Sequence, residues 1–242
     1  MMYNRLMRLD KLLASSGYGT RSEVRKIISR GMVTVDGAVI RDISHQVTGS
    51  EDITINGGQA SLTEYLYFIL DKPDCVITAM EDSHQKCVGD MIPDSLRGKH
   101  LSPVGRLDYH TTGLLIITND GELSHRLTSP KYRISKRYMV EYEGDVLTSD
   151  IARELESGIT LTDMDRPVKL APCTLEIRDN NTCILTLTEG KTHEARRIIS
   201  HYGRTVKTLR RISVGPLELN ETEPGMLRPM TSEEVQLLKG IT

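Results

Sequence analysis

The sequence lacks the long apolar runs that mark membrane-embedded and exported proteins. No window of its 242 residues approaches the roughly 18 consecutive apolar residues that a membrane-spanning helix needs. Its first eleven residues mix Arg5, Arg8, Asp10 and Lys11 with a few apolar ones, so we expect no export signal. With 38% hydrophobic and 26% charged residues, the composition is that of a globular protein, for which we expect a cytoplasmic location.

Closely spaced cysteines are also missing. The four cysteines are Cys75, Cys87, Cys173 and Cys183, and no two of them form a CxxC pair. No histidine lies at a metal-like offset from them, so the sequence predicts no metal site. The count allows disulfides, but a chain of this length without an export signal favours reduced thiols. A glycine-rich dinucleotide motif and βαβ alternation are absent too, so we expect no cofactor and no doubly wound fold.

A large net charge is the third absence, since the formal charge is only -2. The charges are nevertheless segregated along the chain. Residues 1–41 contain eight Lys or Arg against three Asp or Glu, residues 186–211 contain seven against two, and residues 141–165 contain one against eight. This distribution indicates either two basic surfaces on an acidic body or ordinary solvated helix faces.

The N-terminal part shows the pattern of two short helices followed by a hairpin. Apolar residues repeat at helical spacing over residues 9–13 and again over residues 24–28. Between them, Thr20 and Glu23 have the spacing of a capping box, in which side chain and backbone hydrogen-bond reciprocally. Asp36-Gly37 separates two short β-prone runs, which predicts a hairpin turn.

Residues 8–13, 20–22 and 31–37 together resemble the S4 RNA-binding domain, over roughly residues 8–55. The resemblance implies that basic side chains of the two helices contact an RNA backbone, which supplies affinity and position rather than sequence reading. An unrelated helical hairpin with a basic face is the alternative. The RNA-binding residues expected here are Arg8, Lys11, Arg21, Arg25 and Lys26.

A stretch of small polar residues, 56–63, predicts a linker. We therefore expect a small S4-like domain over residues 1–58 and a larger catalytic domain over residues 59–242. Its patterns predict an α+β fold in which helices flank a mainly antiparallel mixed sheet. We expect strands at 65–70, 114–117, 138–142, 175–177 and 183–187, helices at 122–127, 151–156, 193–201 and 233–239, and a break at 71–73.

The segment Gly105-Arg106-Leu107-Asp108, followed by Thr112-Gly113, contains the strongest candidate for chemistry. Asp108 lies in a polar loop just before a buried strand, where core packing can hold it while it stays open to a ligand. Nearby Arg106 and His110 would keep an aspartate ionised, and an ionised carboxylate can act as nucleophile or base. By spacing alone, Asp108 could equally be an ordinary loop residue.

This segment resembles the active-site motif of the pseudouridine synthases related to the small-subunit rRNA enzyme. The resemblance implies that Asp108 is the catalytic nucleophile and that Arg106 fills the gap left by a displaced base. Lys72-Pro73 is similar to a motif near the start of the family's catalytic domain. Residues 136–138 resemble its second motif, whose tyrosine, Tyr138, packs against the target base and is a candidate for proton transfer.

Residues 189–191 with Arg196 and Arg197 resemble the third motif, whose basic side chain pairs with the catalytic aspartate. Adjacent helical residues point about 100° apart, so only one arginine can face Asp108, and we expect Arg196. Glu194 stands where many relatives have glutamine. The resemblance continues through residues 209–217, and the remaining expected RNA contacts are Lys136, Lys191, Arg197, Arg210 and Arg211.

The sequence leaves alternative roles open for Tyr138 and for three histidines. Tyr138 could be half-buried packing in an alternating strand. His110, His193 and His201 could be general bases, but the family does not use them so, and we expect RNA contacts or structural roles.

The whole pattern predicts an enzyme that isomerises a uridine of ribosomal RNA to pseudouridine. The segment 124–130 resembles the small-subunit enzyme, so we expect small-subunit (16S) rRNA, in a partly assembled subunit, as the partner of a monomeric protein. The alternatives are the same reaction on 23S rRNA, a non-catalytic S4-type RNA-binding or ribosome-assembly protein, and a metal-dependent nuclease that uses the acidic residues of 141–165.

Overall fold

A computed structural model describes residues 6–62, 65–163, 165–220 and 223–241 of the chain. The chain divides into two compact units. The first contains residues 1–66 and 94–101, and the second contains residues 67–93 and 102–242. The boundary predicted after residue 58 thus precedes the division observed at residue 66, and the inclusion of residues 94–101 in the first unit was not predicted.

The first unit has the predicted order of two helices and a hairpin. Thr20 caps its second helix, because the Thr20 N–H donates to Glu23 Oε2 at 2.7 Å and the Glu23 N–H donates to Thr20 Oγ1 at 3.3 Å. The hairpin turns at Asp36 and Gly37, whose φ angles are +48° and +79°. The elements are β1 (Met7–Arg8), α1 (Leu9–Ser15), α2 (Arg21–Ser29), β2 (Val33–Val35), β3 (Ala38–Ile40), β4 (Gln46–Val47), β5 (Ile53–Ile55), β6 (Gly58–Gln59) and the 3-10 helix η2 (Asp94–Leu96).

The linker predicted at residues 56–63 is wrong over its first part. Asn56 and Gly57 have φ angles of +53° and +78° and form a second tight turn, after which β6 pairs with β5. Asn-Gly is a hairpin signal, and small polar residues alone do not distinguish a turn from a linker. Residues 63 and 64 lie outside the described residues.

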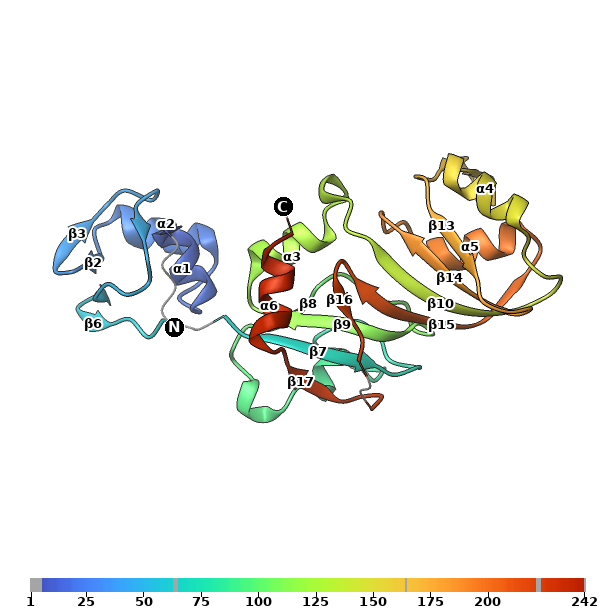
Figure 1. The fold of residues 1–242 in the computed structure, drawn as a ribbon. Coiled ribbons are helices and arrows are strands. Elements are labelled where there is room, and N and C mark those ends of the chain that lie inside the picture. Colours follow the sequence, from blue (N-terminus) through green and yellow to red (C-terminus); the bar gives the residue numbers. More distant parts are fainter. Residues whose placement is uncertain (1–5, 63–64, 164, 221–222, 242) are drawn as a thin grey trace. The chain divides into compact units, whose positions relative to one another are not determined.

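The second unit is built on one large sheet (Figure 1). Its main path has the order β13-β14-β10-β15-β9-β7-β17, with β8 beside β9 and β16 beside β15. Only the β9–β15 pair is parallel among the pairs described, so the predicted mainly antiparallel mixed sheet is confirmed. The strands are β7 (Tyr67–Lys72), β8 (Ser102–Pro103), β9 (Thr112–Thr118), β10 (Lys136–Glu143), β13 (Thr174–Ile177), β14 (Thr182–Leu187), β15 (Thr205–Val214), β16 (Leu217–Glu218) and β17 (Leu227–Pro229).

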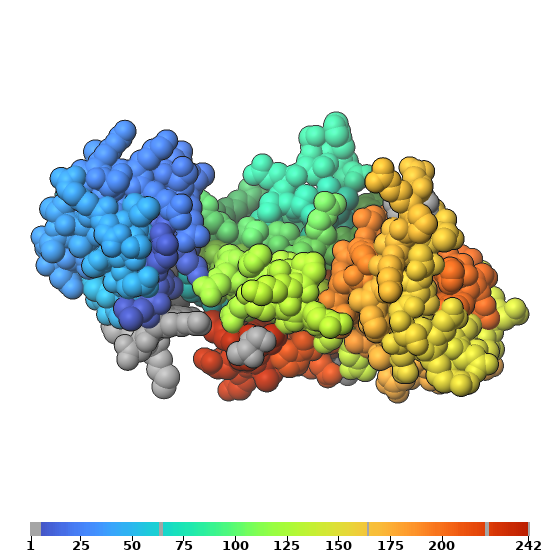
Figure 2. All heavy atoms as spheres, turned by 90° about the horizontal axis from the view of Figure 1, so that it is seen from above, coloured from blue at the N-terminus to red at the C-terminus, as the bar shows by residue number. Residues whose placement is uncertain are grey.

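Four helices flank this sheet: α3 (Gly121–Thr128), α4 (Ser149–Ser157), α5 (Glu194–His201) and α6 (Ser232–Lys239). Helix α5 packs on β15 and α4 on β13, around a core that includes Val140, Leu185 and Ile198. In Figure 2 this part forms one mass, coloured yellow to orange. Short elements complete the unit: η1 (Val88–Met91), η3 (Pro130–Tyr132), β11 (Thr160–Leu161) and β12 (Val168–Lys169).

The break predicted at residues 71–73 comes too early, because β7 continues through Asp71 and Lys72. Both side chains are fully buried. The carboxylate of Asp71 accepts two hydrogen bonds from Arg210, at 3.0 and 2.6 Å, and the ammonium of Lys72 donates to the backbone carbonyls of Pro73 and Tyr109. These partners compensate the burial of two charges, which the local sequence could not reveal.

None of the helices described for this chain has the length and apolar character that crossing a membrane requires.

Candidate active site

The loop between β8 and β9, residues 104–111, carries Asp108. The hydroxyl of Thr78 donates to the Leu107 carbonyl at 2.7 Å and accepts from the Leu107 N–H at 3.1 Å. The Tyr109 carbonyl accepts from the Cys75 N–H at 3.1 Å and from Lys72 Nζ at 3.3 Å. The end of β7 and the segment after it therefore hold the loop on both sides of Asp108, which fixes the backbone from which the Asp108 side chain extends.

The Thr112-Gly113 motif requires a glycine for a steric reason. The φ of Gly113 is +99°, and a Cβ built there would lie 2.3 Å from the Arg211 carbonyl oxygen. Gly113 pairs with Arg211 where β9 runs parallel to β15, so only a residue without a side chain allows the two strands to approach this closely. Pairing with β15 then places the beginning of β9 and the Asp108 loop beside β10 and α5.

Asp108 lines a cavity of about 530 Å³. The cavity lies within the second unit, and its wall includes the expected Arg106 and Tyr138 together with Lys136. The Asp108 side chain is 41% exposed, so it remains accessible to a ligand. Tyr138 also packs against the core around α5, which means that it is both a packing residue and part of the cavity wall.

The nearest ionisable partner described for the Asp108 carboxylate is a histidine. His193 Nε2 lies 3.6 Å from Asp108 Oδ1. His193 caps α5 in a left-handed conformation, with a φ of +51°. The sequence predicted an RNA-contacting or structural role for His193, and its position beside Asp108 was not predicted.

Arg196 occupies a different place from the one expected. Its Nη2 donates to the His110 carbonyl at 2.7 Å, two residues after the aspartate with which it was predicted to pair. Arg197 binds the Asp163 carboxylate through two nitrogens, at 2.8 and 2.6 Å. As helical geometry requires, the two arginines point to different partners. Arg196 holds the backbone of the Asp108 loop, and Arg197 is engaged away from it.

Two basic residues of the cavity wall have little exposed surface: Lys136 is half-buried and Arg211 is buried. Lys136 Nζ donates to the Ile134 carbonyl at 3.2 Å, and burial, together with the charge of Arg211, lowers the pKa of Lys136. Arg211 is 3% exposed, and its Nε donates to the Leu114 carbonyl at 2.8 Å. Arg210 binds the buried carboxylate of Asp71. Arg210 and Arg211 therefore support the sheet, where the sequence predicted RNA contacts.

Two acidic residues meet at the cavity wall. Glu194 is 5% exposed, and its Oε2 accepts a hydrogen bond from the Lys191 N–H at 3.0 Å. Burial raises the pKa of Glu194 to about 7, and its side chain hydrogen-bonds Glu189. A protonated carboxyl can donate a hydrogen bond as an amide does, so Glu194 can donate to Glu189. Lys191 Nζ binds Glu189 Oε1 at 2.9 Å, so this predicted RNA contact has an internal partner.

In the first unit, three of the expected RNA-binding arginines surround one buried aspartate. Asp10 accepts hydrogen bonds from Arg8 at 3.1 and 3.0 Å, from Arg25 at 2.7 Å and from Arg21 at 3.4 and 3.5 Å. Burial opposes the charge of Asp10, but the three arginines lower its pKa to about 2. Three guanidiniums around one carboxylate leave an excess of positive charge, and all three remain 35–50% exposed. Lys26 is exposed and Lys11 half-buried on the same two helices.

The acidic residues of 141–165 that the structure describes do not gather into a group that could hold a metal ion. Among the described residues, the group that could hold a metal ion consists of Asp74, Cys75 and His110. These residues lie outside the acidic segment, so the donors that a metal-dependent nuclease would require there are not brought together.

Comparisons with known proteins agree with this division. The RNA pseudouridylate synthase family matches residues 66–201, and the S4 domain matches residues 7–53. The chain is 39% identical over 239 residues to the uncharacterized RNA pseudouridine synthase YtzG of Bacillus subtilis (strain 168), with 96% of this chain and 98% of the relative covered. It is 36% identical over 230 residues to the ribosomal small subunit pseudouridine synthase A of Vibrio vulnificus (strain CMCP6), with 95% and 98% covered.

A relative named for the other ribosomal subunit is equally similar. The ribosomal large subunit pseudouridine synthase B of Bacillus subtilis is 35% identical over 237 residues, with 97% of this chain and 96% of the relative covered. A solved structure described as a pseudouridylate synthase superposes with a TM-score of 0.68 at 32% identity, covering 96% of this chain and 99% of that one. The chain therefore belongs to the RNA pseudouridine synthase family and carries an S4 domain before its synthase domain.

Proposed function

We propose that this chain isomerises a uridine of ribosomal RNA to pseudouridine with Asp108 as its nucleophile. The observation that carries the proposal is an accessible carboxylate, held by a backbone-bonded loop, at the wall of a cavity of about 530 Å³. Cavities of several hundred Å³ are typical sites for small molecules and nucleotides. Membership in the family supports the reaction, and the position of the loop at the cavity supports Asp108 as the nucleophile.

The reaction rearranges bonds within one nucleotide. The C1′–N1 bond breaks, the uracil rotates, and a C1′–C5 bond forms while C5 loses a proton and N1 gains one. No oxidation or reduction occurs, so the steps need only acid–base and nucleophilic groups. Asp108 either attacks C1′ or removes a proton from C2′, and in both routes the carboxylate must be ionised. His193 Nε2 lies 3.6 Å from Asp108 Oδ1, and the ammonium of Lys72 interacts electrostatically with Asp108, so two basic groups lie near the carboxylate.

The target uridine must leave its base stack to reach the carboxylate, which costs a few kcal/mol. Arg106 is exposed at the cavity and can occupy the vacated space, as the family resemblance implies. Tyr138 forms part of the cavity wall and is placed to pack against the flipped base. The arginines around Asp10 in the S4 domain supply backbone contacts to the RNA.

We further infer that the substrate is small-subunit rRNA in a partly assembled particle and that the protein acts as a monomer. The support is the segment 124–130, which resembles the small-subunit enzyme, and the similarity to the Vibrio protein. Because a large-subunit relative is almost equally similar, the experiment must examine both rRNAs.

The test is to map pseudouridines in both rRNAs from a strain that lacks this gene and from strains complemented with variants. We expect one site in small-subunit rRNA to disappear, to return with the wild-type protein and with Asp145→Asn, and to stay absent with Asp108→Asn. Asp145 is an exposed aspartate of the same unit and serves as the matched control. A lost site in large-subunit rRNA would refute the subunit assignment. Release of tritium from C5 of uridine by Asp108→Asn at the wild-type rate would refute the nucleophile.

A further inference from the structure

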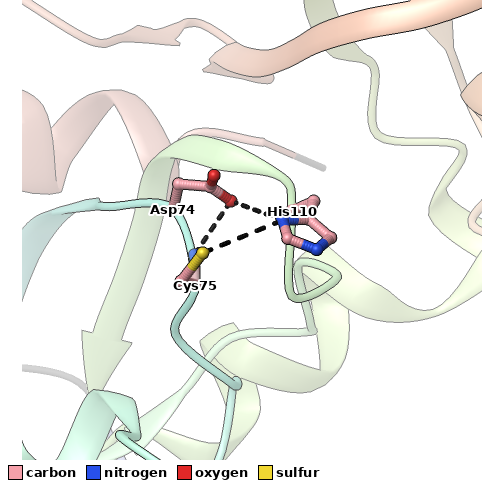
Figure 3. A group of neighbouring side chains, drawn as sticks. All are labelled: Asp74, Cys75 and His110. Carbon is pink, nitrogen blue, oxygen red and sulfur yellow. Dashed lines mark hydrogen bonds and ion pairs between the residues drawn. The ribbon is translucent and has the colours of Figure 1, made fainter.

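Three side chains with metal-binding chemistry meet beside the active-site loop (Figure 3). Asp74 and Cys75 follow β7, and His110 lies on the loop that carries Asp108. His110 Nδ1 is 3.0 Å from Asp74 Oδ1 and 4.0 Å from Cys75 Sγ. We propose that Asp74, Cys75 and His110 bind a zinc ion, or a divalent transition-metal ion of similar chemistry, with water as the fourth ligand.

The donor set and the spacing both fit such an ion. Zinc is held by thiolate, imidazole and carboxylate ligands, and three protein ligands leave one position open. At zinc–sulfur and zinc–nitrogen distances of about 2.3 and about 2.0 Å, a tetrahedral ion holds sulfur and nitrogen about 3.5 Å apart. The ligand atoms of all three residues already lie within 4.8 Å of one another, and all three residues are exposed, so small side-chain rotations suffice.

The backbone at Cys75 helps to hold its side chain in the cluster. Its φ is +58°, a left-handed conformation that is uncommon for residues other than glycine. Two hydrogen bonds of its N–H hold this conformation, one to the Tyr109 carbonyl at 3.1 Å and one to Asp74 Oδ1 at 2.8 Å. Figure 3 shows the Asp74 and Cys75 side chains both directed toward His110. Strained conformations that the surrounding structure maintains are concentrated at functional sites.

Cys75 is also the one cysteine available to an ion from solvent. Cys87, Cys173 and Cys183 are buried, and burial raises the pKa of Cys173 and of Cys183 to about 12. Metal-thiolate formation requires the sulfur to lose its proton, so the buried thiols are poor competitors. A metal–thiolate absorption band from this chain would therefore indicate binding at Cys75, within the proposed site.

An ion at this position would act on the active-site loop. It would join the segment after β7 to His110, whose carbonyl accepts the hydrogen bond from Arg196. The ion would add a bond to a loop that otherwise relies on hydrogen bonds from Thr78, Cys75 and Lys72. Metal occupancy should therefore reduce the mobility of residues 105–113.

Cobalt(II) is the probe for the site, because a cobalt–thiolate bond produces a charge-transfer absorption band. We expect the reduced, full-length protein to bind one Co²⁺ per chain with this band, and Zn²⁺ to displace it. Cys75→Ser should abolish the band, and His110→Gln should weaken Zn²⁺ binding by roughly tenfold or more in competition with a chromophoric chelator. The matched control is His84→Gln, an exposed histidine of the same unit outside the cluster, which should bind as the wild type does.

The same samples give a readout on the loop that does not depend on activity. Hydrogen exchange of residues 105–113 should slow on addition of Zn²⁺ in the wild type and His84→Gln, and should not change in Cys75→Ser. Absence of the thiolate band, or equal Zn²⁺ affinity in the wild type and Cys75→Ser, would overturn the site. Unchanged loop exchange at saturating Zn²⁺ would overturn His110 as a ligand. Failure of either test leaves the proposed uridine isomerisation untouched.

Discussion

Single residues around the cavity determine its chemistry, and Glu194 has the clearest pH dependence among them. Burial raises the pKa of this carboxyl from its ordinary 4.5 to about 7. Between these two pH values the folded protein retains a proton that the unfolded chain releases. The free energy of unfolding should therefore decrease as the pH rises from about 4.5 to about 7, and this contribution should be constant above that range.

Glu194→Gln should remove this pH dependence while keeping a hydrogen-bond donor toward Glu189. We expect the variant to be more stable than the wild type at pH 8 by about 1–3 kcal/mol, and the difference to vanish below about pH 4, where the wild-type carboxyl is protonated in both states. Urea unfolding at pH 5 and pH 8 measures it, with exposed Glu156→Gln as the control. A stability difference that does not change with pH would contradict the retention of a proton by Glu194 in the folded wild type.

Substitutions of Arg196 and of Arg197 should cause different defects, one in catalysis and one in stability. Arg196→Met removes the hydrogen bond to the His110 carbonyl and should lower kcat by roughly 10- to 100-fold without a change in folding, because small misplacements of a reacting group have large effects. Arg197→Met removes the contacts with Asp163 and should mainly lower the melting temperature. Single-turnover kinetics and thermal unfolding of both variants test this, and the reverse pattern would assign the loop to Arg197.

At the scale of elements, Asp10 joins the two helices of the S4 domain. It lies on α1, and two of its arginine partners lie on α2. The arginines lower its pKa from 3.8 to about 2 despite burial. A depressed pKa stabilises the folded state above the unfolded value, so this contribution is complete above about pH 4 and is lost as the pH falls toward 2.

Asp10→Asn should destabilise the packing of α1 on α2, since three arginines would lose their shared anion. We expect a loss of about 2 kcal/mol at pH 7, which should shrink toward pH 2 as the wild-type carboxyl is protonated. Hydrogen exchange of the α1 and α2 amides measures the loss locally. Asp52→Asn, at an exposed position of the same unit, is the control. Equal exchange in Asp10→Asn and wild type at pH 7 would contradict this role.

At the scale of the whole molecule, the two units should divide binding and chemistry between them. Lys26→Glu with Arg30→Glu changes two exposed cations, one on α2 and one at its C-cap. We expect the double variant to raise KM for RNA several-fold, to reduce the salt dependence by about one unit of slope per lost phosphate contact, and to leave kcat unchanged. Lys136→Met at the cavity should instead lower kcat. Equal losses of kcat in both variants would show that RNA binding and catalysis are not divided between the two units.

Local patterns determined much of this organisation. Thr20 with Glu23, and Asp36 with Gly37, specify a helix start and a hairpin through contacts between near neighbours, so the sequence alone predicted both. The strand after Asp108 and the helix carrying Arg196 followed from apolar patterning in the same way. The proposed nucleophile, Asp108, came from a contiguous motif, and the residue lines the cavity in the structure.

Other features depended on partners distant in the chain. Lys72 is 37 residues from the Tyr109 carbonyl that it binds, Arg210 is 139 residues from Asp71, and His110 is 35 residues from Cys75. No periodicity connects such residues, because sheet pairing brings them together only after the fold has formed. The sequence by itself therefore determined the family, many of the elements and the choice of Asp108 as the candidate nucleophile. The tertiary structure decided which basic residues remain available to RNA, and it placed Asp74, Cys75 and His110 in one cluster, since buried charges and metal ligands are satisfied by whichever groups the fold brings within bonding distance.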